Sequence, residues 1–125
     1  MKYFEIYNIT DLYLKHIKDS DKPYLPAKIN FILSQNFKKL LKIRDDIEQT
    51  RKNVIIHYGN VDETGNYQIT DINNLQQAQK ELDALSSMET NIDYTPISLK
   101  DIEDIEFSPG QFEAIEWMIK DEQDG

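Results

Sequence analysis

The chain has 125 residues, enough for one domain with its own hydrophobic core, and we treat residues 1–125 as that single domain. It holds 14 Lys and Arg against 23 Asp and Glu, a net charge of −9, and it contains no cysteine, which excludes disulfides and thiol chemistry. It has no run of about 18 apolar residues and no apolar signal region at its start, so we expect no membrane segment and a location in the cytoplasm.

The first expected elements are short. Aromatic and β-branched residues at 2–8 favour a short N-terminal strand. Thr10 or Asp11 is expected to cap a short helix that runs to about residue 17. A turn over 19–23 then leads to Pro26, which sharpens the start of the next element.

One long helix, over residues 25–58, dominates the sequence pattern. Pro26 suits its first position, Gly59 suits a left-handed C-terminal cap, and neither Gly nor Pro lies between them. Its apolar residues recur at alternating spacings of four and three, which is a heptad-like stripe. The stripe consists of Ile29, Leu33, Leu40, Ile43, Ile47 and Val54, and it also passes through the polar residues Asn36, Thr50 and His57.

This stripe must be covered, because a helix over residues 25–58 is about 50 Å long and exceeds the diameter of a small domain. Another helix of the same chain can cover it, which makes it an ordinary buried face. A second copy can also cover it, and the stripe is then a self-association seam in which Asn36 fixes the register. We expect a homo-oligomer, most simply a two-fold dimer, because the rest of the chain covers only part of the stripe.

A second helix is expected over residues 74–88, after a small hairpin or loop around Gly65 and Asn66. Asn73 or Asn74 is expected to cap it. Its apolar stripe predicts that it folds back on the long helix as an antiparallel helical hairpin. The residues of this stripe, which should meet the middle of the long helix, are Leu75, Ala78, Leu82 and Leu85.

The C-terminal part is expected to hold an extended segment and a last helix. Residues 90–99 should pair with the N-terminal strand, and Pro96 limits them to a sheet edge. Ser98 is expected to cap a turn. The stretch Ser108-Pro109-Gly110-Gln111 is a capping box that starts a helix over 109–120. The fold is therefore expected to be mainly α with a minor β part, and residues 121–125 to fray.

No catalytic signature accompanies these elements. The chain lacks glycine-rich phosphate-binding patterns, and two histidines without cysteine are too few for a zinc site. We therefore expect no enzyme activity, no metal and no cofactor. A basic turn over residues 38–44 is able to bind phosphate, so a nucleic-acid-binding accessory protein is the alternative function. The acidic residues at 45–48 and the net charge of −9 argue against it.

Acidic residues concentrate toward the C-terminus. Residues 1–52 carry a net charge of +4, whereas residues 53–125 carry −13. Aromatic residues lie among these carboxylates, which is typical of an interaction surface because aromatics supply contact energy and charges steer association. The alternative is a solvated acidic surface around a buried Trp117. The candidate interaction residues are Glu103, Asp104, Glu106, Phe112, Glu113, Glu116 and Trp117.

Several short patterns recur in a characteristic order: residues 25–28 (LPAK), 38–40 (KKL), 58–59 (YG), 65–66 (GN), 97–102 (ISLKDI) and 108–112 (SPGQF). In this order the chain resembles a family of short, functionally uncharacterised proteins encoded by tailed phages and prophages of Gram-positive bacteria. The resemblance implies a phage origin and brings no catalytic residues. We expect a protein that acts by contact with a host or virion protein, as an inhibitor of a host defence or host enzyme or as an accessory of virion assembly.

Overall fold

The computed structural model describes residues 1–18 and 22–120, and this part of the chain is mainly helical with a few short strands. The predicted turn over 19–23 lies partly outside the described residues, and the predicted frayed tail, 121–125, lies wholly outside them. In the part that the structure describes, no helix has both the length and the apolar character needed to cross a membrane. The elements are α1 (Tyr3–Tyr13), η1 (Leu14–Lys18), α2 (Ala27–Tyr58), β1 (Asn60–Val61), β2 (Tyr67–Gln68), α3 (Ile72–Ser87), β3 (Ile97–Ser98), η2 (Leu99–Asp101), α4 (Pro109–Ile115), η3 (Glu116–Met118) and β4 (Ile119–Lys120).

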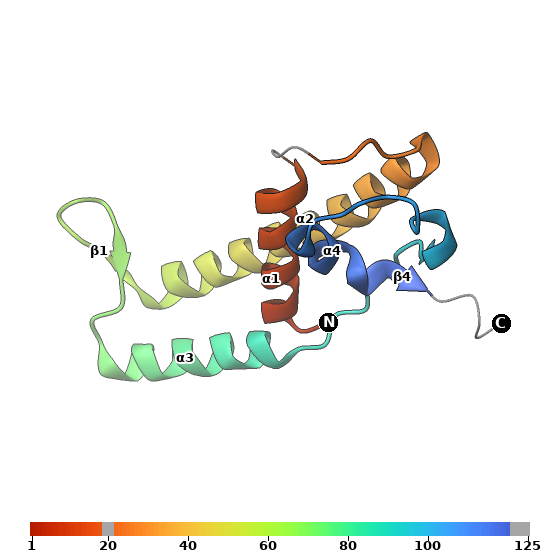
Figure 1. The fold of residues 1–125 in the computed structure, drawn as a ribbon. Helices are drawn as coiled ribbons and strands as arrows, with labels where there is room; N and C mark the ends of the chain where they lie inside the picture. Colours follow the sequence, from red (N-terminus) through yellow and green to blue (C-terminus); the bar gives the residue numbers. More distant parts are fainter. Residues whose placement is uncertain (19–21, 121–125) are drawn as a thin grey trace.

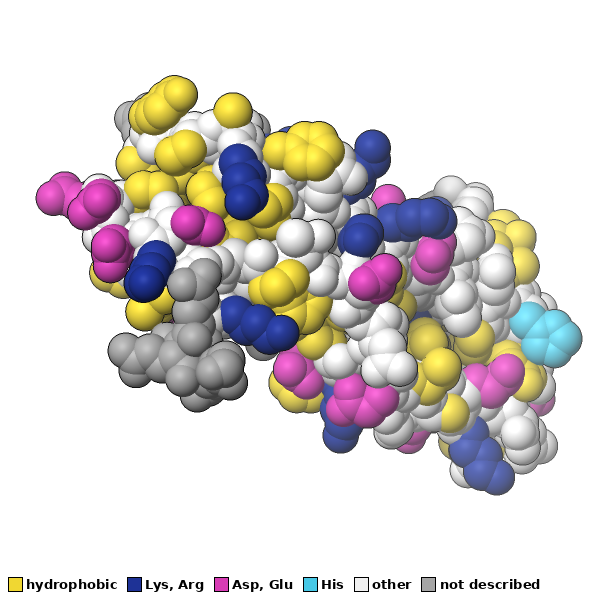
Figure 2. Space-filling view, turned by 90° about the vertical axis from the view of Figure 1, so that its right-hand side faces the viewer, with side chains coloured by type: hydrophobic (Ala, Val, Ile, Leu, Met, Phe, Trp, Pro, Cys, Tyr) yellow, Lys and Arg dark blue, Asp and Glu magenta, His cyan; other side chains and the backbone are white. Residues whose placement is uncertain are grey.

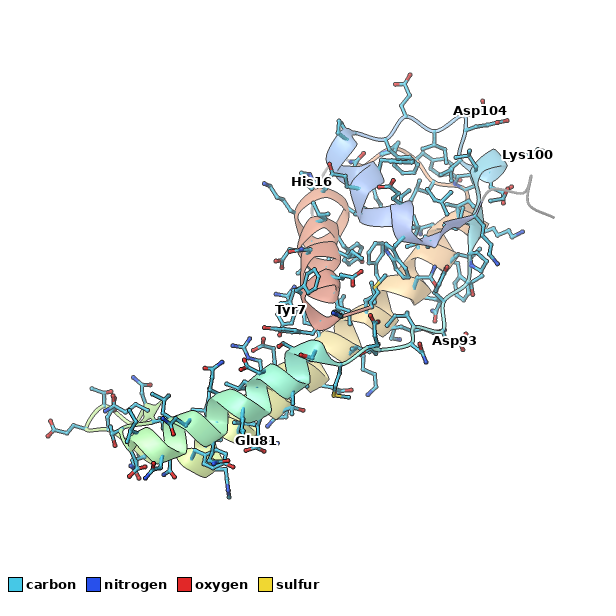
Figure 3. All side chains as sticks on the ribbon, turned by 90° about the horizontal axis from the view of Figure 1, so that it is seen from below. Tyr7, His16, Glu81, Asp93, Lys100 and Asp104 are labelled. Atoms are coloured by element: carbon cyan, nitrogen blue, oxygen red, sulfur yellow. The ribbon has the colours of Figure 1, made fainter. Side chains whose placement is uncertain are left out.

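The molecule consists of a head and an arm (Figure 1). The head contains α1, the first half of α2 and everything after α3. The arm contains the second half of α2, the β1–β2 ribbon and α3, which lies beside α2 in both Figure 1 and Figure 3. With 32 residues, α2 is about 48 Å long and runs through both parts.

The predicted N-terminal strand is wrong, because residues 3–13 form helix α1 and continue into the π-helical turn η1. The Lys2 N–H donates to the Glu5 carboxylate at 3.2 Å and so caps the start of the helix. Ile6 and Thr10, which are four residues apart, are both fully buried. Burial thus follows the helical period and outweighs the strand preference of the aromatic residues.

The long helix is present, but both of its ends differ in detail from the prediction. Pro26 precedes the first helical residue, Ala27, instead of occupying that position. Gly59 has φ −99° and ψ 173°, so it is extended and the predicted left-handed cap is wrong. Glycine is required there because a Cβ would lie 2.5 Å from the Ile55 carbonyl oxygen and 3.1 Å from that of Gln68.

The small hairpin predicted after the long helix is confirmed. Strands β1 and β2 pair antiparallel, with Val61 opposite Tyr67. Gly65 takes the positive φ, 87°, that the turn needs. The Asp62 carboxylate accepts hydrogen bonds from the backbone N–H groups of Thr64 and Asn66, both at 2.9 Å, which holds the turn closed.

Helix α3 begins two residues before the predicted start and is capped by Asp71, not by Asn73 or Asn74. The Asp71 carboxylate accepts from the Asn74 N–H at 3.0 Å. Of the predicted stripe, Ala78 is buried, Leu82 and Leu85 are partly buried, and Leu75 is 47% exposed, so the burial of the stripe weakens toward the start of α3. Leu85 lines a small hollow together with Ile43 and Ile47 of α2.

The C-terminal part closes the head with a strand pair that the sequence did not predict. Strand β3 pairs in parallel with β4, so Ile97 lies opposite Ile119 and not beside an N-terminal strand. This pairing requires extended backbone at Ile119, so the helix predicted over 109–120 is shorter: α4 ends at Ile115 and the 3₁₀ turn η3 ends at Met118. The predicted capping box is confirmed, because the Ser108 hydroxyl accepts from the Gln111 N–H at 3.2 Å and the Gln111 side chain accepts from the Ser108 N–H at 2.9 Å.

The core lies in the head, where α1, α4 and the first half of α2 meet. Asn36 is fully buried within it. Its Nδ2 donates to the Thr95 carbonyl at 2.8 Å, and its Oδ1 accepts from the Thr95 N–H at 2.9 Å. One side-chain amide therefore takes the place of a neighbouring strand for the backbone of residue 95. The buried hydrophobic residues of this core include Ile6, Ile17, Leu25, Ile29, Leu33, Phe37, Leu40, Ile97, Ile102, Ala114, Ile115 and Met118.

The stripe predicted as a self-association seam is largely covered by the chain itself. Ile29, Leu33, Asn36, Leu40 and Ile47 are buried, and Ile43 and Val54 are partly buried. Asn36 sets a register within one chain instead of between two copies. Homo-oligomerisation stays a prediction, but these side chains do not offer a continuous surface for it.

Replacing Asn36 with Ala should lower the free energy of unfolding by about 1–3 kcal/mol, because both backbone groups of Thr95 lose their partner. Urea unfolding followed by circular dichroism measures this. The matched control is Asn30→Ala on the exposed side of the same helix, for which we expect a change within about 0.5 kcal/mol. Equal stability of the two variants would show that the amide does not hold the head together.

Replacing Gly59 with Ala should loosen the outer end of the arm, because the added Cβ meets backbone oxygens that cannot move without breaking the last turn of α2. We expect a loss of about 1–3 kcal/mol in the opening free energy of the amides in β1 and β2, measured by hydrogen exchange. Gly65→Asn is the control, since no atom lies within 4 Å of the added Cβ and Asn tolerates a positive φ. If hydrogen exchange of these amides is unchanged in Gly59→Ala, residue 59 does not lie as close to the Ile55 and Gln68 carbonyl oxygens as the structure indicates.

Candidate interaction surfaces

The predicted acidic residues lie on the head, in the segment after η2 and on α4 and η3. Glu103, Asp104 and Glu106 are exposed in the segment between η2 and α4, and Glu113 and Glu116 are exposed on α4 and η3. Figure 2 shows acidic side chains grouped at the left end of the molecule, and Figure 3 labels Asp104 at the end opposite the arm. The structure therefore keeps all five predicted carboxylates accessible to a partner.

Trp117, the predicted aromatic anchor of this surface, is partly buried, which favours the alternative of an inward-facing ring. Its ring packs inward, with its centroid 6.1 Å from that of Phe37 and 5.1 Å from that of Tyr94. The Nε1 atom of Trp117 is buried and has no hydrogen-bond acceptor among the described residues. Phe112 is 38% exposed and Leu99 is 44% exposed, so these two carry the accessible apolar surface among the carboxylates.

The predicted basic turn over residues 38–44 does not present all of its charges to a ligand. Arg44 turns toward α1, where Nη1 donates to the Thr10 hydroxyl and the Asp11 carboxylate, both at 2.7 Å. Its guanidinium also lies 4.5 Å from the centroid of the Tyr7 ring. Lys39 donates to the Asp93 carbonyl at 2.6 Å. These contacts break up the row of cations that a phosphate backbone would need.

The remaining lysines of this turn border a groove between α2 and the end of α1 with η1. We call it the lysine groove, and its volume is about 650 Å³, within the range of ligand-binding clefts. Sequence reasoning found the lysines of α2 but missed Tyr13 and Lys18, because they come from a different helix. The lining residues are Tyr13, Lys18, Ser34, Gln35, Lys38, Lys39, Leu41, Lys42 and Asp45.

The end of the arm exposes large hydrophobic side chains. Of the eleven such side chains exposed in the described residues, five belong to this end, which we call the arm tip. The sequence places them in the ribbon and at the adjoining helix ends, but it does not reveal that they remain uncovered. They are Ile56, Val61, Tyr67, Ile72 and Leu75, with exposed fractions from 43% to 67%.

A polar cluster ties the arm side of α2 to α1. The Tyr7 hydroxyl donates to the Glu48 carboxylate, and Glu48 also lies 3.7 Å from Arg51. Burial, together with the hydrogen bond to Glu48 and its negative charge, raises the pKa of Tyr7 to about 12. A phenol with this pKa stays protonated at neutral pH, so Tyr7 serves as a hydrogen-bond donor between the helices.

Neither the chemistry of these surfaces nor a comparison with known proteins assigns a function to the chain. Within residues 1–18 and 22–120, no three His, Cys, Asp or Glu side chains gather in a way that could hold a metal ion. No protein-family model, no curated protein and no solved structure matches the chain. The acidic surface, the lysine groove and the arm tip are therefore the features that bear on its function.

The Tyr7–Glu48 contact predicts a specific pH dependence. Because the pKa of Tyr7 in the folded state lies above its ordinary value of 10, the contact stabilises the fold fully below pH 10. This contribution should be lost as the pH rises from about 10 to about 12. Thermal unfolding from pH 8 to 11.5 should show a steeper fall for the wild type than for Tyr7→Phe. Parallel curves would mean that folding does not raise the pKa of Tyr7.

Proposed function

We propose that the protein is a non-enzymatic, phage-encoded protein that acts by protein–protein contact, with the arm tip as its main contact surface. The observation that carries this proposal is the concentration of exposed hydrophobic side chains at the arm tip. Ile72, for example, is 67% exposed. Covering apolar surface of this kind contributes about 25 cal/mol per Å², and exposed hydrophobic groups gathered at one place are characteristic of interaction sites.

The arm supports this surface as a preformed structure. We propose that α2 and α3 work as an antiparallel helical hairpin that holds the tip away from the head. Three features support a fixed tip: the ribbon pairs Val61 with Tyr67, Gly59 packs closely on the Gln68 backbone, and the Asn74 side chain donates to the Tyr58 carbonyl at 3.4 Å. A preformed surface loses less conformational entropy on binding than a flexible one.

Two roles follow from this proposal: inhibition of a host defence or host enzyme, and assistance in virion assembly. Both place the protein in the cytoplasm of the host cell. The acidic end of the head would steer a basic partner in either role, since exposed charges act mainly on the association rate. Nucleic-acid binding, the alternative suggested by the basic turn, has less support because the side chains of Arg44 and Lys39 already make hydrogen bonds within the same chain.

Site-specific crosslinking in phage-infected cells tests the proposal. A photoreactive phenylalanine analogue replaces Tyr67 at the arm tip, and the same analogue replaces Tyr24, which is 87% exposed on the head, as the matched control. We expect a discrete crosslinked protein from position 67 only. A virion structural protein would assign the assembly role, and a host protein would assign the inhibitory role.

A second pair of variants tests whether the apolar character of the tip matters. Ile72→Asp should abolish the crosslink from position 67, because it places a charge inside the proposed contact. Met88→Asp is the control, since Met88 is similarly exposed, at 59%, but lies at the other end of α3. Both variants should keep the circular dichroism of the wild type. A crosslink that Ile72→Asp leaves intact, or equal crosslinking from positions 24 and 67, would overturn the proposal.

A further inference from the structure

We propose that the lysine groove binds the acidic end of a second copy of this chain, so that heads associate in a head-to-tail order. The acidic segment concerned, residues 99–106, is called the acidic loop below. This inference does not involve the arm tip and does not depend on the proposed function. It rests on the complementary charge and polarity of two surfaces that one chain carries at different places.

The groove is a strongly basic site on an acidic protein. Four of its lining residues are lysines and one is an aspartate, whereas the whole chain carries −9; of the four lysines, Lys39 already donates to the Asp93 carbonyl. Lys38 and Lys42 are exposed at the groove, and the only ion pair that either makes within the described residues is the one between Lys42 and Asp46, at 3.8 Å on the surface. Such an exposed pair contributes little and is easily exchanged for a stronger partner. The groove therefore favours an anionic occupant.

The groove also has an apolar part, which narrows the choice of occupant. Tyr13 and Leu41 line it beside the lysines. Tyr13 is stacked on the buried Phe37 at a centroid distance of 4.0 Å, so this part of the lining rests on the core of the head. A bare phosphate would leave the apolar lining uncovered. An anionic segment that also carries an apolar side chain would cover both.

The acidic loop is such a segment. Asp101, Glu103, Asp104 and Glu106 are exposed, and none of these carboxylates makes an ion pair within the part of the chain that the structure describes. Leu99 lies at the start of the loop and is 44% exposed. The buried Ile102 anchors the loop to the core, which keeps its charged side chains on the outside. The loop also contains Lys100, so it offers an aliphatic side chain among four negative charges and one positive charge, a net of −3.

The groove and the middle of the acidic loop lie apart in one molecule. Figure 3 labels His16, which is two residues from Lys18 of the groove, and Asp104 of the loop at different places on the head. Contact between the groove of one copy and the loop of the next leaves one open groove and one open loop at the ends of the pair. Such a heterologous contact allows further copies to add. At physiological salt the charges near the contact dominate, because those beyond about 8 Å are screened.

Sedimentation velocity over a concentration series tests the proposal with two variants. The groove variant carries Lys38→Glu and Lys42→Glu, and the loop variant carries Glu103→Gln and Asp104→Asn. The wild type should form dimers and larger species as its concentration rises. Each variant alone should associate at least about tenfold more weakly. A mixture of the two should form a complex of twice the 14.7 kDa mass and stop there, because only one intact groove faces one intact loop.

The control variant carries Lys28→Glu and Lys52→Glu, which change the net charge as the groove variant does but replace exposed lysines outside the groove. It should associate like the wild type. Three results would overturn the proposal: a wild type that stays monomeric at high micromolar concentration, equal weakening in the groove and control variants, or a mixture that forms no complex. Binding of a short DNA duplex to a monomeric wild type, lost in the groove variant, would instead assign the groove to nucleic acid.

Discussion

The head is closed by one buried amide. Asn36 lies in the first half of α2 with no exposed surface, and its side chain satisfies both backbone groups of Thr95. Residue 95 is thereby held against α2 just before β3, and β3 in turn pairs with β4 after α4. The amide thus fixes the path by which the C-terminal part returns to the head. Its two hydrogen bonds must form together, because a buried polar group without a partner is costly.

The sequence predicts those features whose causes are local. The long helix follows from periodic spacing between Pro26 and Gly59, and the start of α4 follows from the Ser108 capping box. The features that failed have distant causes. The end of the last helix depends on pairing with a strand some twenty residues earlier, and the place of Asn36 depends on the Thr95 backbone. A polar residue within an apolar stripe indicates that its side chain has a hydrogen-bond partner, but the sequence does not indicate which residue provides that partner.

The candidate surfaces follow the same division. The carboxylates of the acidic end were predictable, since exposed charge is read directly from composition, whereas the inward packing of Trp117 depends on Phe37 and Tyr94. The lysine groove needs Lys18 from η1 beside the lysines of α2, a proximity that arises only when the helices cross. The exposure of the arm tip reflects the absence of any covering element in the described chain, which no local pattern reveals.

Head and arm differ in how they are stabilised, and this difference suits the proposed contacts. Helix α3 buries fully only Ala78, whereas the head contains the large buried cluster around Phe37 and Leu40. Changes at the arm tip therefore remove few buried contacts and should leave the core of the head folded. Head-to-tail association through the lysine groove and the acidic loop would use surfaces of the head and leave the arm tips uncovered. A row of heads would then present several tips to one target assembly, and such multivalent binding exceeds the affinity of a single tip without any new contact.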